Sequence, residues 1–161
     1  LLELGEIQKP ELIGQVLDVL AVMTSLSARS AVVEASDEDI TEMVQLVDQL
    51  VNTMGEKEVH TEIWIQFSHK MMSIHRNLVL RLVGNGLRTQ FLGSTMNLGF
   101  EPDIDLSAVK QQLIRLRDSI KIRDEVNVRD AVIQHFQIIK TGLLLSAIEA
   151  SAEVERSTGN A

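Results

Sequence analysis

Residues 40–54 read ITEMVQLVDQLVNTM, and their apolar side chains recur every three or four positions. The recurring residues are Ile40, Met43, Val44, Val47, Leu50, Val51 and Met54. This spacing matches the turn of an α-helix and puts the apolar side chains on one face, whereas a half-buried strand would alternate every second residue. Ser36 precedes the pattern with Asp39 three residues later, as in a capping box, and Gly55 follows it. We therefore expect an amphipathic helix over about residues 37–54.

The rest of the chain extends this helical pattern. Proline occurs only at positions 10 and 102, so long helices are allowed. Further helices are expected at about 11–33, 57–74, 77–96, 106–122 and 124–151. The apolar residues of 77–96 surround the helix axis, which predicts a central helix buried on most sides. Asp103 or Asp105 can cap the helix that follows the loop. The sequence thus predicts an all-α fold, an antiparallel bundle of about six to seven helices, as a single domain over residues 1–161.

Composition narrows the possible functions. The 161 residues carry 15 Lys and Arg against 23 Asp and Glu, and a net charge of −8 is unsuited to gripping DNA directly. The absence of cysteine excludes disulfide frameworks, thiolate zinc sites and cysteine nucleophiles. The sequence contains no run of 18 uncharged apolar residues, and no basic, apolar signal opens it. We expect a cytoplasmic protein with no membrane partner.

Motifs for catalysis and for metal binding are missing. No two of the four histidines stand at i and i+4, so the helical metal motif is absent, and no G-x-S-x-G elbow exposes a serine. No catalytic residue and no enzyme activity are predicted. His60, His69 and His75 are expected on the surface. His135 lies among Ile133, Phe136, Ile138 and Ile139, so it is either a satisfied core histidine or part of a ligand pocket.

Two other polar features invite a phosphate-binding interpretation. A basic stretch comprises Lys110, Arg115, Arg117, Lys121 and Arg123, but Asp118 and Asp124 interleave with it. A solvated helix face is the simpler reading. The Gly84-Asn85-Gly86 segment lacks the strand and the Lys-Ser/Thr partner of a phosphate loop, so glycine there is expected to allow close helix packing.

The order of several short motifs resembles the effector domain of GntR-family bacterial regulators. They include Glu11, Gln15, Asp18 and Leu20, the Val22-x-Thr24-x-x-Ser27 stretch, and Phe67 ten residues before Asn77. Arg123-Asp124 and His135 fit the closing helix of the family, and Leu82-Val83-Gly84-Asn85-Gly86-Leu87 is similar to a segment of its fatty-acid-responsive FadR branch. The resemblance covers about residues 1–150.

The resemblance implies a homodimer that contacts operator DNA through an upstream winged helix-turn-helix domain. That domain is not in this chain, which we expect to be a fragment. The implied small-molecule effector is a long-chain fatty acyl-CoA. Positions similar to ligand-facing ones in the FadR branch are Met23, Ser68, Phe91, Gln134, Gln137 and Thr141, and we add Gln112 and His135.

Many relatives in this branch of the family bind a divalent metal through an Asp-x3-His pair and two later histidines. Here the corresponding positions carry Trp64, Ser68, and Gln112 or Leu113, and only His135 remains. One imidazole is too few ligands to hold an ion, so no metal and no cofactor are expected. Two alternatives stay open, namely a metal-dependent sensor of a small organic acid on the same fold, and a helical interaction module without a ligand.

Overall fold

The computed structural model describes residues 10–74, 77–79, 82–84, 86 and 102–158, and its long elements are all helices. They are α1 (Pro10–Glu34), α2 (Asp37–Asn52), α3 (Lys57–Ile74), α5 (Leu106–Lys121) and α6 (Glu125–Thr158). No strand occurs among the described residues. The predicted all-α bundle is confirmed, and four of the helices begin and end within two residues of the predicted bounds. The last helix is longer than predicted, because it continues to Thr158.

The helix ends follow local side-chain chemistry. Ser36 and Asp39 form the predicted capping box, since each side chain accepts a hydrogen bond from the backbone amide of the other. Asp105 caps α5 by accepting from the amide of Ala108 at 2.9 Å. After α2, Gly55 adopts a φ of +108°, a conformation that side chains rarely tolerate.

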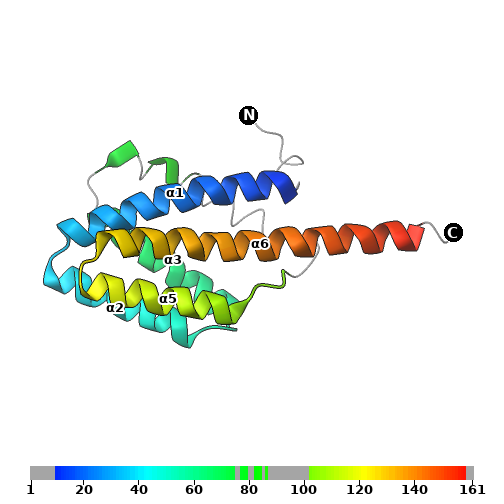
Figure 1. Ribbon diagram of the computed structural model, residues 1–161. Coiled ribbons are helices and arrows are strands. Elements are labelled where there is room, and N and C mark those ends of the chain that lie inside the picture. The colour runs from blue at the N-terminus through cyan, green and yellow to red at the C-terminus, as the bar shows by residue number, and fades with distance from the viewer. Residues whose placement is uncertain (1–9, 75–76, 80–81, 85, 87–101, 159–161) are drawn as a thin grey trace.

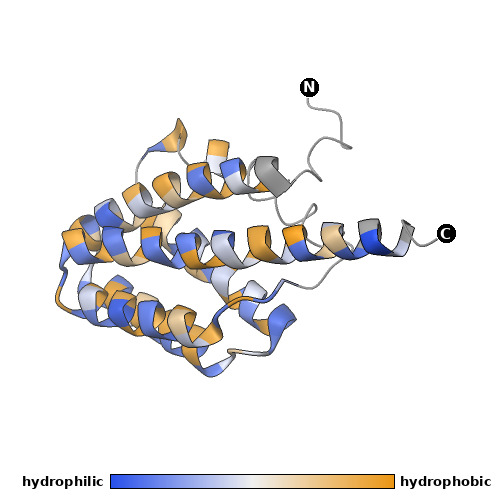
Figure 2. Ribbon diagram, turned by 45° about the vertical axis from the view of Figure 1, so that its right-hand side comes forward, coloured by the Kyte–Doolittle hydropathy of each residue, from blue (hydrophilic) through white to orange (hydrophobic). Residues whose placement is uncertain are grey.

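The helices run antiparallel to their main neighbours. The longest interface joins α1 to α6, where Asp18 pairs with Lys140 and Arg29 pairs with Glu125. Figure 1 shows α6 along the middle of the bundle with its C-terminal end projecting beyond the other helices. Hydrophobic and hydrophilic residues interleave along each helix in Figure 2, as in amphipathic helices.

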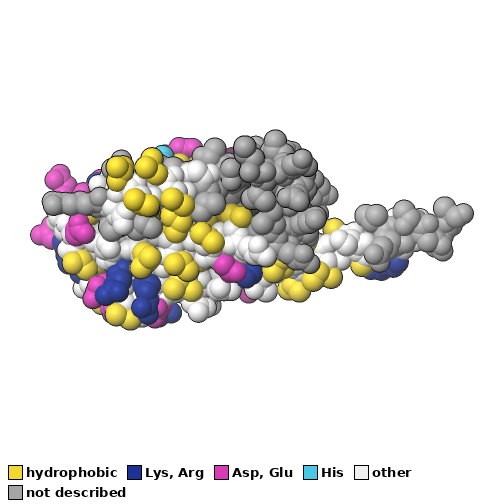
Figure 3. Space-filling view, turned by 90° about the horizontal axis from the view of Figure 1, so that it is seen from above, with side chains coloured by type: hydrophobic (Ala, Val, Ile, Leu, Met, Phe, Trp, Pro, Cys, Tyr) yellow, Lys and Arg dark blue, Asp and Glu magenta, His cyan; other side chains and the backbone are white. Residues whose placement is uncertain are grey.

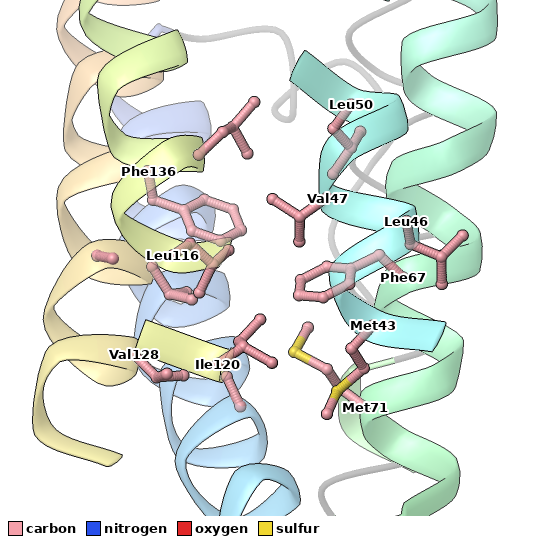
Figure 4. Packing of buried hydrophobic residues seen from close by; sticks show 14 of the residues in the cluster. Met43, Leu46, Val47, Leu50, Phe67, Met71, Leu116, Ile120, Val128 and Phe136 are labelled. Atoms are coloured by element: carbon pink, nitrogen blue, oxygen red, sulfur yellow. The ribbon is translucent and has the colours of Figure 1, made fainter. Parts of the chain in front are cut away.

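The core lies between two groups of helices. Figure 4 shows Val47 and Leu50 of α2 and Phe67 of α3 facing Leu116 of α5 and Phe136 of α6. All five side chains are buried. Helices α1 and α6 are also long and apolar enough to cross a membrane by length and composition alone, but their apolar faces pack against each other and this core.

One arginine ties two helix junctions together. Arg123 lies in the turn between α5 and α6 with a φ of +55°, and its Nη1 donates to the carbonyls of Val32 at 3.0 Å and Ala35 at 2.7 Å. These carbonyls belong to the C-terminal end of α1, where helix carbonyls lack partners within the helix. Arg123 is therefore a structural cap rather than part of a solvated basic face.

The loop before α5 is held tightly against α6. The amide of Asp103 donates to Ser146 Oγ at 2.8 Å, and a Cβ atom on Gly142 would lie 2.7 Å from the Asp103 carbonyl oxygen. Only glycine fits at position 142 without displacing backbone. This contact sets the start of α5 relative to α6.

The predicted burial of the helix at 77–96 is wrong for the described residues of that stretch, although residues 78–79, 82–84 and 86 are helical as predicted. Leu78, Val79, Leu82 and Val83 are all exposed. Gly84 lies against Met23 and Met72, but a Cβ there would be 3.7 Å from the Met23 methyl group and from the Met72 sulfur, which is ordinary contact and does not require glycine. Leu87 and Phe91 lie outside the described residues.

Candidate effector site

The site is centred on His135, which is only 3% exposed. Its imidazole stacks on the indole ring of Trp64, with centroids 4.5 Å apart and planes inclined by 17°. The Phe136 ring stands steeply to both, with its centroid 5.9 Å from that of His135 at 90° and 6.0 Å from that of Trp64 at 74°. An aromatic cluster therefore joins α3 to α6 in the interior of the bundle.

Helix geometry explains the contribution of α3. Trp64, Phe67, Ser68 and Met71 follow the i, i+3, i+4, i+7 spacing, so they share one face. Phe67, Ser68 and Met71 are buried, which shows that this face points into the bundle. Ser68 therefore lies one turn from Trp64 on the same inward face, as a buried hydroxyl beside the aromatic cluster.

Two buried polar side-chain atoms are left unpaired, one in this cluster and one on α5. Neither Nδ1 of His135 nor Oε1 of Gln112 has a hydrogen-bond partner among the residues that the structure describes. Helices α5 and α6 are antiparallel and are joined by a turn that contains Arg123 and Asp124. Gln112 on α5 comes eleven residues before Arg123, and His135 on α6 comes eleven residues after Asp124. Both lie about 16 Å from the turn and so at the same level. An unpaired buried polar atom costs about 1–3 kcal/mol, so each of these two atoms requires a partner from outside the chain, either a water molecule or a ligand.

Burial controls the charge of the histidine. Desolvation lowers the pKa of His135 to about 3, and the nearby His60 lowers this pKa further in the same direction. The imidazole is therefore neutral at physiological pH. Burial also lowers the pKa of His60, whose Nδ1 lies 3.5 Å from Thr53 Oγ1. The site presents neutral hydrogen-bonding groups rather than a positive charge from these histidines.

The structure brings together only part of the predicted set. Ser68 and His135 are buried, and Gln112 is half-buried with an inward oxygen. Met23 is half-buried on α1, beside Gly84. Phe91 lies outside the described residues. The remaining three predicted residues, Gln134, Gln137 and Thr141, are exposed on α6 and do not join His135.

Two features of the site were not foreseen from the sequence. His60 was expected on the surface, but it is half-buried and lies one turn before Trp64 on the inward side of α3. Trp64 was recognised only as a replacement for a metal ligand, and its stacking on His135 was not predicted. The four-residue spacing from His60 to Trp64 to Ser68 was the signal that placed all three on one face.

The residues do not fit a metal ion. No group of three or more His, Cys, Asp or Glu side chains able to hold one occurs in the described part of the chain. Trp64 packs flat on the ring of His135, and Ser68 and Gln112 offer neutral oxygens, which suit zinc or nickel poorly.

One protein-family model matches most of this chain. A family model described as the FCD domain matches residues 15–138. The chain belongs to the FCD domain family. The FCD domain is an all-α bundle and forms the C-terminal effector domain of GntR-family transcription regulators. This chain is therefore an effector-binding regulatory domain. No curated protein matches the chain.

Proposed function

We propose that this FCD domain senses a long-chain fatty acyl-CoA, bound without a metal ion beside His135, and thereby controls DNA binding by a GntR-type regulator. The single observation that carries the proposal is the pair of unpaired buried atoms, His135 Nδ1 and Gln112 Oε1, at one level of an apolar core. They stand at positions where metal-binding relatives are expected to carry ligands. Buried polar atoms that have no hydrogen-bond partner in the protein suit a ligand that supplies a donor or an acceptor for each.

The chemistry of the two atoms complements a thioester. With its proton on Nδ1, neutral His135 donates a hydrogen bond to the thioester carbonyl, and Gln112 Oε1 accepts one from an amide N–H of the pantetheine arm. The apolar side chains around Phe67, Met71 and Phe136 provide the environment for the acyl chain.

Because the imidazole of His135 is uncharged, the site favours a thioester ligand over a carboxylate ligand. A small organic acid presents a carboxylate, which in metal-dependent sensors is neutralised by the ion, and an imidazole with a pKa of about 3 supplies no such charge. A thioester carbonyl is uncharged and needs only a donor. This difference supports the acyl-CoA over the organic acid.

The energetics are favourable for an acyl chain. Burying about a dozen methylene groups at roughly 0.8 kcal/mol each yields a gross gain near 10 kcal/mol, before the cost of ordering the chain and the protein. Micromolar affinity needs only about 8 kcal/mol net. The ligand would join α3, α5 and α6 more firmly, and the altered arrangement of helices would shift paired DNA-binding domains away from their half-site spacing.

Trp64 makes this proposal directly testable, because it is the only tryptophan in the chain and it touches His135. Titrating the protein with oleoyl-CoA in the presence of a chelator should change the Trp64 emission and saturate at micromolar concentrations. Free coenzyme A serves as the control for the headgroup alone, and oleate for the chain with a carboxylate in place of the thioester.

The two alternative functions predict different results in this titration. A metal-dependent sensor would respond to zinc with citrate and lose the response with chelator, which would overturn the acyl-CoA proposal. A ligand-free interaction module would leave the emission unchanged with all of these additions. Equal responses to oleate and oleoyl-CoA would contradict the role assigned to the thioester.

A further inference from the structure

Trp64 stands between the buried rings of the aromatic cluster and the molecular surface. His135, Phe67 and Phe136 are 3%, 0% and 7% exposed, whereas Trp64 is half-buried. The indole of Trp64 lies against all three rings, with centroid distances of 4.5 Å, 5.8 Å and 6.0 Å in that order. The indole is therefore the part of the cluster that a molecule from solvent meets first.

The stack of Trp64 on His135 leaves no room for a ligand between the two rings. Carbon atoms in contact are about 3.5–4.0 Å apart. Centroids 4.5 Å apart with planes inclined by 17° therefore describe an offset stack in contact. Neither an acyl chain nor a water molecule fits into such a stack. A ligand that approaches His135 from the α3 side must displace the indole.

Trp64 is also the ring of the cluster that can move with the least disturbance. Phe67 and Phe136 are enclosed by the core, so turning either ring outward would leave a cavity there. Trp64 already reaches the surface, and a change between staggered rotamers leaves the backbone of α3 unchanged. Its rotation exposes the face of His135 and leaves the rest of the cluster in place.

The surface beside the indole has room for an outward rotamer. Side chains of a helix lean toward its N-terminus, so an indole turned outward from α3 lies over the preceding turn. That turn carries His60 and Thr61, which are both half-buried, so solvent lies next to the indole on this side.

We propose that Trp64 is the gate of the effector site. In the closed state, which the structure shows, the indole lies on His135 and fills the space beside it. In the open state the indole turns outward over His60 and Thr61, and the effector occupies the space that it leaves. The gate rests on the proposed function in one respect, namely that the effector binds beside His135.

Fluorine NMR tests the gate without any substitution, because Trp64 is the only tryptophan in the chain. 5-Fluorotryptophan incorporated at position 64 gives one resonance for each slowly exchanging state of the indole. The labelled chain should show the closed state in exchange with an open state of roughly 1–10%, a common population for a minor conformation. Oleoyl-CoA, added with a chelator, should shift the population toward the open state.

The outcomes of this experiment separate the gate from the identity of the effector. Exchange that oleoyl-CoA does not shift would support the gate and contradict the acyl-CoA proposal. A single resonance without exchange, unchanged in a chain that binds oleoyl-CoA, would overturn the gate and leave the acyl-CoA proposal standing. A single resonance without exchange in a chain that does not bind oleoyl-CoA would overturn both.

Trp64→Ala measures how strongly the closed gate opposes binding. When the open state is a minor one, the apparent affinity is reduced in proportion to the open fraction. Removal of the indole should therefore tighten oleoyl-CoA binding about tenfold or more, as measured by calorimetry. Leu26→Ala is the matched control, because Leu26 is an exposed apolar residue of α1 and Figure 3 shows hydrophobic side chains gathered on the face that α1 turns to the viewer. This variant should leave the affinity unchanged.

The opposite result would identify a purely structural role for the indole. Weaker binding by a folded Trp64→Ala chain than by the unaltered chain would show that the indole is a fixed wall of the site, and would overturn the gate. Circular dichroism verifies that the variants remain helical. If the alanine variant does not fold, fluorine NMR of the labelled chain decides between a gate and a wall.

Discussion

Substitution of Gly142 by alanine should disturb the junction between the 102–105 loop and α6. The added Cβ would lie 2.7 Å from the Asp103 carbonyl oxygen and 3.1 Å from Ile104 Cα. Both atoms belong to the backbone, so the clash cannot be relieved by rotating a side chain. The loop must move by several tenths of an ångström, together with the start of α5.

The expected magnitude comes from two opposing effects. Alanine in a helix interior is about 0.5–1 kcal/mol more favourable than glycine. Overpacking of a tight contact costs about 1–3 kcal/mol. Gly142→Ala should therefore lower the free energy of unfolding by roughly 0–2.5 kcal/mol and, at about 2–4 °C per kcal/mol in a chain of this size, lower Tm by up to about 10 °C.

Gly14→Ala provides the matched control on α1. A Cβ there would meet Lys140 Cε at 3.4 Å, which is close to ordinary contact with the flexible end of a side chain. This variant should be neutral or should raise Tm by a few degrees through helix propensity. Thermal unfolding followed by circular dichroism compares the two. An increase of Tm in Gly142→Ala equal to that in Gly14→Ala would refute the close approach of the loop to α6.

Three further outcomes follow from the structure. Arg123→Ala removes two charge-assisted hydrogen bonds to the carbonyls of Val32 and Ala35, so denaturant unfolding should show a loss of about 2–3 kcal/mol, against less than about 1 kcal/mol for the exposed Arg115→Ala. The pKa of His135 falls from 6.5 to about 3 on folding, so the unfolded chain takes up the proton first as pH drops. Stability should therefore decrease by roughly 2 kcal/mol between pH 6.5 and 5, at about 1.4 kcal/mol per pH unit, and His135→Phe should flatten this dependence. The pKa of Asp39 is lowered to about 2 by hydrogen bonds from Lys70 and Ser36, so its contribution is present above about pH 4 and is lost below it. An Asp39→Asn variant that kept the full acid dependence between pH 4 and 2 would contradict that assignment.

The helices were predictable because their signals are local. The capping box of Ser36 and Asp39, the cap at Asp105 and the apolar period of residues 40–54 each depend on residues within a few positions of one another. These interactions survive in any packing arrangement, so the bounds of α2 and the start of α5 follow directly from them.

The sequence-based predictions failed where contacts between residues far apart in the chain determine burial and hydrogen bonding. The sequence of residues 77–83 is apolar on most sides of a helix, and this pattern fits a buried helix and an exposed apolar surface equally well. In the structure, Leu78 and Leu82 are exposed. Arg123 looked like one charge in a basic stretch, because its partners at Val32 and Ala35 are about 90 residues away in the chain.

The candidate site was predictable only in part for the same reason. His135 was identified because its neighbours in sequence are apolar. Its stacking on Trp64, and the unpaired Oε1 of Gln112 at the same level, depend on how α3, α5 and α6 assemble. Periodicity along one helix gives no distance to another.

The most direct test of the effector site measures stability and binding together in Gln112→Leu. Leucine removes the unpaired oxygen, so the free energy of unfolding should rise by about 1 kcal/mol. The affinity for oleoyl-CoA, measured by Trp64 emission with chelator present, should fall at least tenfold. Gln111→Leu, at the exposed neighbouring position, should leave the affinity unchanged. Higher stability of Gln112→Leu with unchanged affinity would contradict the claim that these buried polar atoms exist to meet an effector.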